Sequence, residues 1–91
     1  MEQPKVSADW GAVGDEAADV ALEAVQELAR ASVKFPPFNS AHEGFAVLKE
    51  EVDELWDEVK RRPVPERQER LRAEARQVAA MALRFMMDCT R

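Results

Sequence analysis

The sequence predicts an all-α protein: a helical hairpin or bundle of three main helices, with a four-helix-type core completed by oligomerisation. Apolar residues recur at alternating spacings of three and four along the chain, and no segment has the alternating pattern of a strand. Prolines, which cannot sit inside a helix, divide the chain at residues 36–37 and 63–65. Since 91 residues build only a small core, we expect a homodimer or homotetramer to cover the remaining apolar faces.

The expected organisation is an N-terminal arm over residues 1–14 and a single helical domain over residues 15–91. The arm contains Pro4 and two glycines and has no sustained helical period. A short loop joins the last two helices, so we expect them to form an antiparallel hairpin. The three helices are predicted over residues 15–33, 40–62 and 66–88.

The helix over residues 40–62 has the clearest sequence signals. Ser40 and Glu43 have the spacing of a capping box, in which the hydroxyl and the carboxylate each accept from the other residue's backbone amide. A heptad row follows the cap and is expected to pack against a partner helix. Its members are Phe45, Leu48, Val52, Leu55 and Val59.

The composition of the chain argues against two classes of partner, nucleic-acid polymers and membranes. Eighteen acidic and 13 basic residues give a formal net charge of −5, which argues against a nucleic-acid polymer as partner. No apolar run approaches the length that spans a bilayer, so no membrane association is expected. Cys89 is the single cysteine, and no secretory signal pattern opens the chain, so we expect a cytoplasmic location.

An acidic run in the second helix is the first candidate site. At about 100° per residue, Glu51, Glu54 and Glu58 form one stripe, and Glu51 lies at the edge of the apolar row. Asp53 and Asp57 point elsewhere and are expected to be plain surface. Acidic runs of this kind are commonly solvated faces, so their meaning depends on what the third helix places opposite.

The third helix carries an acid within its apolar stripe. Glu74 shares a spacing series with Leu71 and Val78, where an unpaired carboxylate is costly to bury. Glu74 could form a buried salt bridge to Arg30 or Arg84, or it could be a metal ligand facing the acids of the second helix. Gln77, one turn on, could add a carbonyl oxygen. Oxygen-only ligands suit Mg²⁺ or Mn²⁺.

These residues resemble a known family. Residues 50–54 have the form E-E-x-x-E, and Glu74 opens a second acidic motif on the next helix. The stretch from residue 38 to residue 88 is similar to small proteins of the MazG-like superfamily of all-α nucleoside triphosphate pyrophosphohydrolases. The resemblance implies cleavage of a nucleoside triphosphate to a monophosphate and pyrophosphate with Mg²⁺ or Mn²⁺. It implies Glu51, Glu54 and Glu74 as metal ligands, and Glu50 as a further acid for a metal or for the attacking water.

One position departs from that family. Its second motif is E-x-x-D, whereas here Gln77 stands where the aspartate is expected. An amide in place of a carboxylate removes one negative charge from the metal site. This change leaves open a catalytically weak or inactive homologue that binds nucleotide and metal. If the acids are only surface charges, a non-enzymatic helical dimerisation module is the other alternative.

If the resemblance holds, Glu50 or Glu54 would orient or deprotonate the attacking water. Lys49, Lys60 and Arg76 could contact the outer phosphates, although residues of this kind are more often only solvated surface charges. Trp56 would stack on the base or pack in the core or an interface. Base preference does not follow from the sequence.

Overall fold

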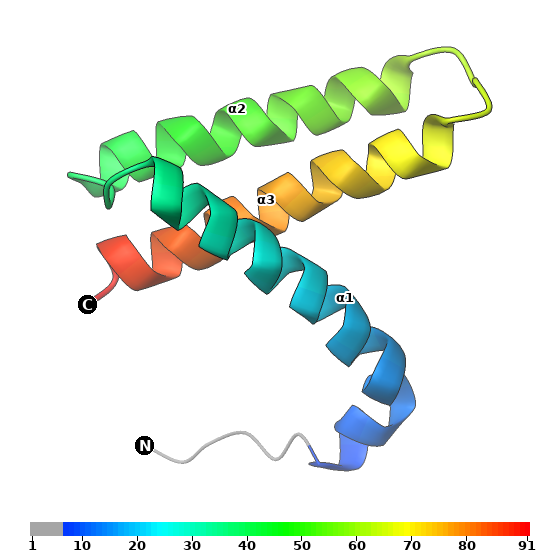
Figure 1. Cartoon of the computed structure of the whole chain (residues 1–91), viewed down its shortest axis with the longest axis horizontal. Coiled ribbons are helices and arrows are strands. Elements are labelled where there is room, and N and C mark those ends of the chain that lie inside the picture. Colours follow the sequence, from blue (N-terminus) through cyan, green and yellow to red (C-terminus); the bar gives the residue numbers. More distant parts are fainter. Residues whose placement is uncertain (1–6) are drawn as a thin grey trace.

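The structure, a computed structural model, describes residues 7–91 of the chain. It contains three helices, α1 (Ser7–Lys34), α2 (Ala41–Lys60) and α3 (Arg67–Cys89), and the described part of the chain has no strand (Figure 1). The prediction of an all-α chain with three main helices is therefore confirmed.

Helix α1 begins at Ser7, whereas a helix was expected only from residue 15. The expected arm is thus largely helical over its second half, and residues 1–6 lie outside the described residues. Gly14 interrupts this helix with a positive φ of 23° and a ψ of −118°, a conformation that glycine adopts without a Cβ clash. The helix therefore bends at Gly14, and Asp15, the first residue of the predicted helix, lies just after the bend.

Helix α2 begins at the predicted cap. Ser40 is the N-cap residue, and its Oγ accepts from the backbone N–H of Glu43 at 3.1 Å. The return bond differs from the expected capping box. The Glu43 carboxylate accepts from the backbone N–H of Asn39 at 3.2 Å and from the Asn39 side-chain amide at 3.1 Å, instead of from Ser40. The acid therefore fixes the loop one residue earlier.

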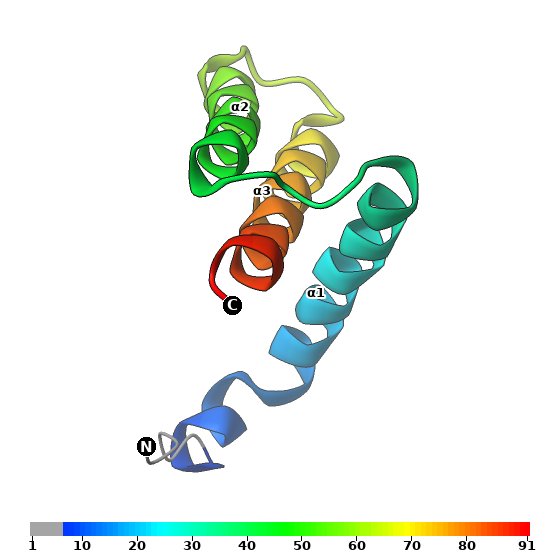
Figure 2. The same cartoon turned by 90° about the vertical axis from the view of Figure 1, so that its left-hand side faces the viewer.

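Helices α2 and α3 form the expected antiparallel hairpin, and α1 crosses α3 (Figures 1 and 2). Helix α1 packs on α3 and not on α2. Helix α3 is thus the central element that both other helices contact, and the space between α1 and α2 is left to side chains and solvent.

The core is small and gathers side chains from α1, α2 and the α1–α2 loop around α3. Its buried apolar residues include Ala31, Phe38, Ala80 and Met81, and Ala80 is 0% exposed. Gly44 lets α2 approach this point closely, because a Cβ there would lie 2.9 Å from Cδ2 of Phe85. Adding a methyl group at Gly44 would overpack the contact at a cost of about 1–3 kcal/mol.

The loop between α1 and α2 is held by the end of α3. The buried guanidinium of Arg84 donates to the carbonyl oxygens of Phe35 and Pro36 and lies over the ring of Phe38, 4.5 Å from its centroid. The backbone N–H of Phe38 donates to the Asp88 carboxylate at 3.1 Å. Arg84 and Asp88 therefore satisfy loop groups that lie far from them in sequence.

The predicted apolar row of α2 divides between two faces. Leu48 and Leu55 are half-buried toward α3, whereas the other members of the row are exposed. Only one edge of the row can contact α3, and the second edge meets no other helix of the described chain. We call that exposed edge the outer row of α2. It consists of Phe45, Val52, Trp56 and Val59, which are 42–59% exposed.

None of the three described helices combines the length and the apolar character that crossing a membrane requires. The fold-class prediction is thus confirmed for its helical content and hairpin. Completion of a four-helix core by a second copy stays a prediction.

Candidate functional site

Three carboxylates converge between the two helices of the hairpin. Glu51 and Glu54 come from α2 and Glu74 from α3. Each offers one oxygen, and these oxygens all lie within 4.8 Å of one another. Glu51 and Glu74 are half-buried, whereas Glu54 is exposed at the rim. We call these three residues the carboxylate cluster. Its members are the three acids that the sequence predicted as metal ligands.

Proton affinity in the cluster is raised by burial and by the neighbouring acids. Burial first, and then the adjacent Glu54 carboxylate, raise the pKa of Glu51 to about 7. Burial likewise raises the pKa of Glu74, with further contributions from Glu54 and Glu58. Because like charges crowd this site, an added positive charge would favour the ionised form of each acid.

One cluster oxygen is buried without a partner. Oε2 of Glu74 has no hydrogen-bond donor within reach, and Glu74 forms no ion pair with the described residues. Arg30 and Arg84, the two candidates for a buried salt bridge, are engaged elsewhere. Arg30 pairs with Glu27 at 2.7 Å, and Arg84 binds the loop carbonyls. The salt-bridge alternative for Glu74 is therefore contradicted, and its orphaned oxygen fits a cation ligand.

Gln77 lies next to an acid of α1 that the sequence did not single out. The hydrogen bond from Arg30, and then the one from Gln77, lower the pKa of Glu27. Gln77, Glu50 and Glu51 all line one cavity. The structure thus brings Gln77 and Glu50 to the cavity beside Glu51. Glu50 lies one turn before Glu54 on α2, and Gln77 lies one turn after Glu74 on α3.

The predicted substrate contacts on α2 lie outside that cavity. Lys49 pairs with Asp53 at 3.0 Å, and both are exposed. Lys60 pairs with Asp57 at 3.5 Å and lies over the ring of Trp56, 5.5 Å from its centroid. These side chains follow the solvent side of α2, where Asp53 and Asp57 were expected as plain surface.

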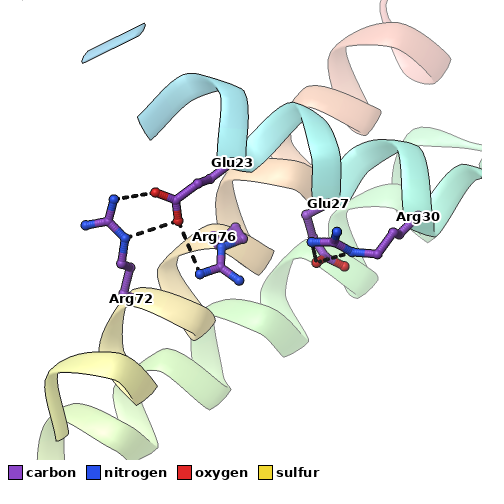
Figure 3. Close-up of polar contacts among 5 residues, drawn as sticks. All are labelled: Glu23, Glu27, Arg30, Arg72 and Arg76. Carbon is purple, nitrogen blue, oxygen red and sulfur yellow. Dashed lines mark hydrogen bonds and ion pairs between the residues drawn. The ribbon is translucent and has the colours of Figure 1, made fainter. Parts of the chain in front are cut away.

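Arg76 is engaged with α1. Arg72 and Arg76 of α3 both bind the carboxylate of Glu23, the latter at 3.2 Å (Figure 3). Hydrogen bonding to Arg72, the larger influence, and the charges of both arginines lower the pKa of Glu23. We call these three residues the arginine-paired contact. It joins α1 to α3 and occupies the side chain that was predicted to reach phosphate.

The cavity has a volume of about 690 Å³ and lies between α1 and α2, which do not pack on each other. Helix α3 forms its floor with Gln77, Met81 and Arg84. Helix α2 contributes Glu50 and Glu51 to one wall. The facing wall comes from α1, which the sequence analysis did not assign to a site.

Sequence reasoning missed the α1 wall, although a signal was present. Glu27, Arg30 and Lys34 recur at spacings of three and four, on the side of α1 that also carries the buried Ala31. Charged residues flanking a buried alanine predict that this helix face meets a polar space. The spacing on α1 could be recognised in the sequence, but the position of the facing wall on α2 could not be predicted from it.

Comparisons with protein-family models, with curated proteins and with solved structures found no match to this chain. Membership of the MazG-like superfamily therefore stays a prediction, made on the residues of the two acidic motifs. The case for a function depends on the carboxylate cluster and on the cavity beside it.

Proposed function

We propose that this protein is a metal-dependent nucleoside triphosphate pyrophosphohydrolase, which cleaves an NTP or dNTP to the monophosphate and pyrophosphate. The observation that carries the proposal is the carboxylate cluster of Glu51, Glu54 and Glu74, which comes from two helices and forms no ion pair with a cationic side chain of the described residues. A solvated acidic face would not leave two of its acids half-buried or a buried oxygen of Glu74 without a donor.

The cluster residues suit a hard divalent cation. All three donors are carboxylate oxygens, and Gln77 adds an amide on the adjoining surface. When bound, Mg²⁺ or Mn²⁺ would offset the charge of the phosphate oxygens and favour ionisation of a water molecule. Glu51 and Glu74 hold protons more strongly than ordinary glutamates, so cation binding would displace protons from them.

Glu50 is the side chain best placed to act on the attacking water. It lines the cavity next to Glu51, and its side chain is exposed. In the proposal Glu50 accepts the water proton as a general base. Glu54 is a cluster ligand that also borders solvent, so it is the alternative base. Phosphate contacts from Lys49, Lys60 and Arg76, and stacking by Trp56, stay predictions.

The second candidate function is nucleotide and metal binding with little or no turnover. Gln77 favours it, because this amide stands where a fourth carboxylate is expected and contacts Glu27 of α1. The fold and the cluster would then retain affinity for a nucleotide with its cation, and only the rate of hydrolysis would differ. The third candidate, a helical module without a metal, requires the cluster acids to be replaceable at no cost to any activity.

A second copy of the chain is part of the proposal. Each outer-row residue of α2 would be largely removed from water in a homodimer or homotetramer, completing a four-helix core around the hairpin. Val52→Glu should therefore lower the molecular mass measured by analytical ultracentrifugation, whereas Asp57→Lys, on the same helix but outside the row, should leave it unchanged. An unchanged mass for Val52→Glu would contradict this part.

The proposal places the protein in the cytoplasm, where nucleoside triphosphates are formed and the lone Cys89 would stay a thiol.

The proposed hydrolase activity is tested by incubating each NTP and dNTP with the purified protein and Mg²⁺ or Mn²⁺, and assaying pyrophosphate and phosphate. We expect pyrophosphate release that Glu51→Gln abolishes and Asp53→Asn preserves. Asp53 is the matched control, since it lies on the same helix and is exposed. Equal activity of the two variants would contradict the proposal.

Metal binding without any turnover would favour the second candidate. In that case Gln77→Asp is the first variant to make, because it restores the carboxylate that the resemblance leads us to expect. Pyrophosphate release gained by that variant would locate the lost step at this position. If the protein shows no metal binding and no turnover, the helical module is the remaining candidate.

A further inference from the structure

The cavity between α1 and α2 has the size of a small-molecule site. Its volume of about 690 Å³ falls within the range of about 300–1,000 Å³ that ligand pockets occupy. It combines charged walls with an apolar surface from Phe35, Val47 and Met81. Phe35 is 57% exposed, so its ring is available to a ligand.

Two of the three cations that line this cavity lie on α1. Arg30 and Lys34 are one turn apart near the end of α1, and both line the cavity. Glu27 accepts from Nε and from a terminal nitrogen of Arg30, at 3.1 and 2.7 Å, and so fixes the direction of that side chain (Figure 3). Lys34 forms no ion pair with any residue that the structure describes. Its charge is therefore available to a ligand.

Arg84, the third cation of the cavity, is a different case. Its guanidinium is buried, donates to two loop carbonyls and lies over Phe38. Moving it toward a ligand would break those bonds. Arg84 is thus a structural side chain, and Arg30 and Lys34 are the cations that a ligand can reach.

Carboxylates stand opposite these cations. Glu51 is the cluster member that lines the cavity, so the carboxylate cluster borders the α2 wall of the cavity through this side chain. A ligand spanning the cavity would meet the cluster at one end and the α1 cations at the other. A polyanion carrying a divalent cation satisfies both ends, because the cation contacts the acids and the free phosphate oxygens contact arginine and lysine.

We infer that this cavity binds the nucleoside triphosphate, with its phosphates held between the carboxylate cluster and the α1 residues Arg30 and Lys34, and its apolar surfaces against Phe35, Val47 and Met81. The inference rests on the proposed function and adds to it a phosphate-binding wall on α1. It assigns the phosphate contacts to residues other than Lys49, Lys60 and Arg76.

A simpler role for Lys34 must be separated from this one. Lysine in the last turn of a helix interacts favourably with the helix dipole, which affects stability but not nucleotide affinity. The discriminating readout is therefore affinity, measured without turnover. Lys34 is exposed, so its replacement should not prevent folding.

The test uses isothermal titration calorimetry on the full chain. Mn²⁺ alone is titrated first, and then α,β-methylene analogues of ATP, GTP, CTP and UTP in the presence of Mn²⁺. The variants are Lys34→Glu and the control Arg70→Glu, which makes the same charge change at an exposed position of α3 outside the cavity. We expect unchanged Mn²⁺ affinity in both variants. Analogue affinity should fall about tenfold or more for Lys34→Glu and less than twofold for Arg70→Glu.

Other outcomes overturn the inference in distinguishable ways. Analogue binding that both variants weaken equally would mean that Lys34 acts only through net charge, and the proposed hydrolase would be unaffected. Mn²⁺ binding without binding of any analogue would contradict the cavity as a nucleotide site and leave the metal centre. Absence of Mn²⁺ binding would overturn both the inference and the proposed function.

Discussion

Two sites between helices of this protein contain acids, and they differ in whether a cationic side chain pairs with those acids. At the arginine-paired contact between α1 and α3, Glu23 meets Arg72 and Arg76, which lower its pKa (Figure 3). At the carboxylate cluster between α2 and α3, Glu51 meets two further acids, and its pKa rises to about 7. The Glu23 carboxylate is thus paired with arginines of the chain, whereas the carboxylate cluster has no cationic partner among the described side chains.

The difference teaches that an acid between two helices has two distinct uses. Glu23 joins helices through charges of opposite sign, as an exposed ion pair does. Glu51 and Glu74 raise the free energy of the folded chain, because burial and like charges oppose their ionisation. Sites with such strain are often functional, which is why the cluster and not the paired contact carries the proposed activity.

The largest expected effect separates the two sites by activity. Glu51→Gln should lower kcat/KM for pyrophosphate release by about 100-fold or more, because even outer partners of metal ligands contribute 10–100-fold. Glu23→Gln should change it less than about threefold, since its contacts are to arginines outside the cluster. Steady-state kinetics with Mg²⁺ measures both. A comparable loss in the two variants would mean that Glu51 acts only through the fold.

The next effect concerns the amide beside the cluster. Gln77→Asp adds a carboxylate on the helix turn that follows Glu74, so Mn²⁺ affinity should rise about tenfold, which corresponds to about 1.4 kcal/mol. Calorimetry with Mn²⁺ measures the change. Glu69→Gln, an exposed acid on the same helix, is the control and should leave the affinity unchanged. Unaltered affinity in Gln77→Asp would place this position outside the ligand set.

A third prediction is that a substitution in the carboxylate cluster stabilises the metal-free protein, whereas most substitutions destabilise a protein. Without metal at pH 8, Glu51→Gln should stabilise the protein by about 1 kcal/mol, or about 4–8 °C in Tm, because it removes a half-buried charge from a cluster of like charges. Glu23→Gln should lower Tm, because it leaves two arginines without their partner. Thermal unfolding followed by circular dichroism measures both, and a lowered Tm for Glu51→Gln would show that a partner for this acid has been missed.

The smallest effect is the pH dependence that follows from Glu51. The folded protein holds this proton up to about pH 7, whereas the unfolded chain releases it near 4.5. The folded state thus binds more protons between these values, so this carboxyl makes the free energy of unfolding fall as pH rises from about 4.5 to about 7. Above that range its contribution is level. Urea unfolding of the metal-free protein at several pH values should show this decline, and Glu51→Gln should reduce it.

The hairpin and most of the cluster could be predicted because their signals are local. The Ser40 cap, the prolines and the helical spacing placed the helix over 40–62 close to α2, and the spacing of Glu51, Glu54 and Glu74 placed them on facing stripes. Such features depend on one helix or on two adjacent ones. The same local reading failed at Gly14, where the glycine bends α1 instead of separating an arm from a helix.

The features that could not be predicted from the sequence depend on packing between distant segments. The row from Phe45 to Val59 predicted an apolar contact but not which edge of it α3 would cover. Arg84 was read as a candidate partner for Glu74, whereas the crossing of α1 over α3 gives it the loop carbonyls instead. Arg30 and Lys34 reach the cavity only because of that crossing angle, which no periodicity specifies.

The central claim is that the carboxylate cluster is a divalent cation site, and thermal unfolding at pH 8 with increasing MnCl₂ or MgCl₂ tests it most directly. For the wild type we predict a rise in Tm that corresponds to about 2.7 kcal/mol at a cation concentration 100 times Kd. Glu51→Gln should unfold at a higher temperature without metal and show no further rise, whereas Asp53→Asn should behave as the wild type. A wild-type Tm that does not respond to either cation, or an equal rise in Glu51→Gln, would contradict the claim.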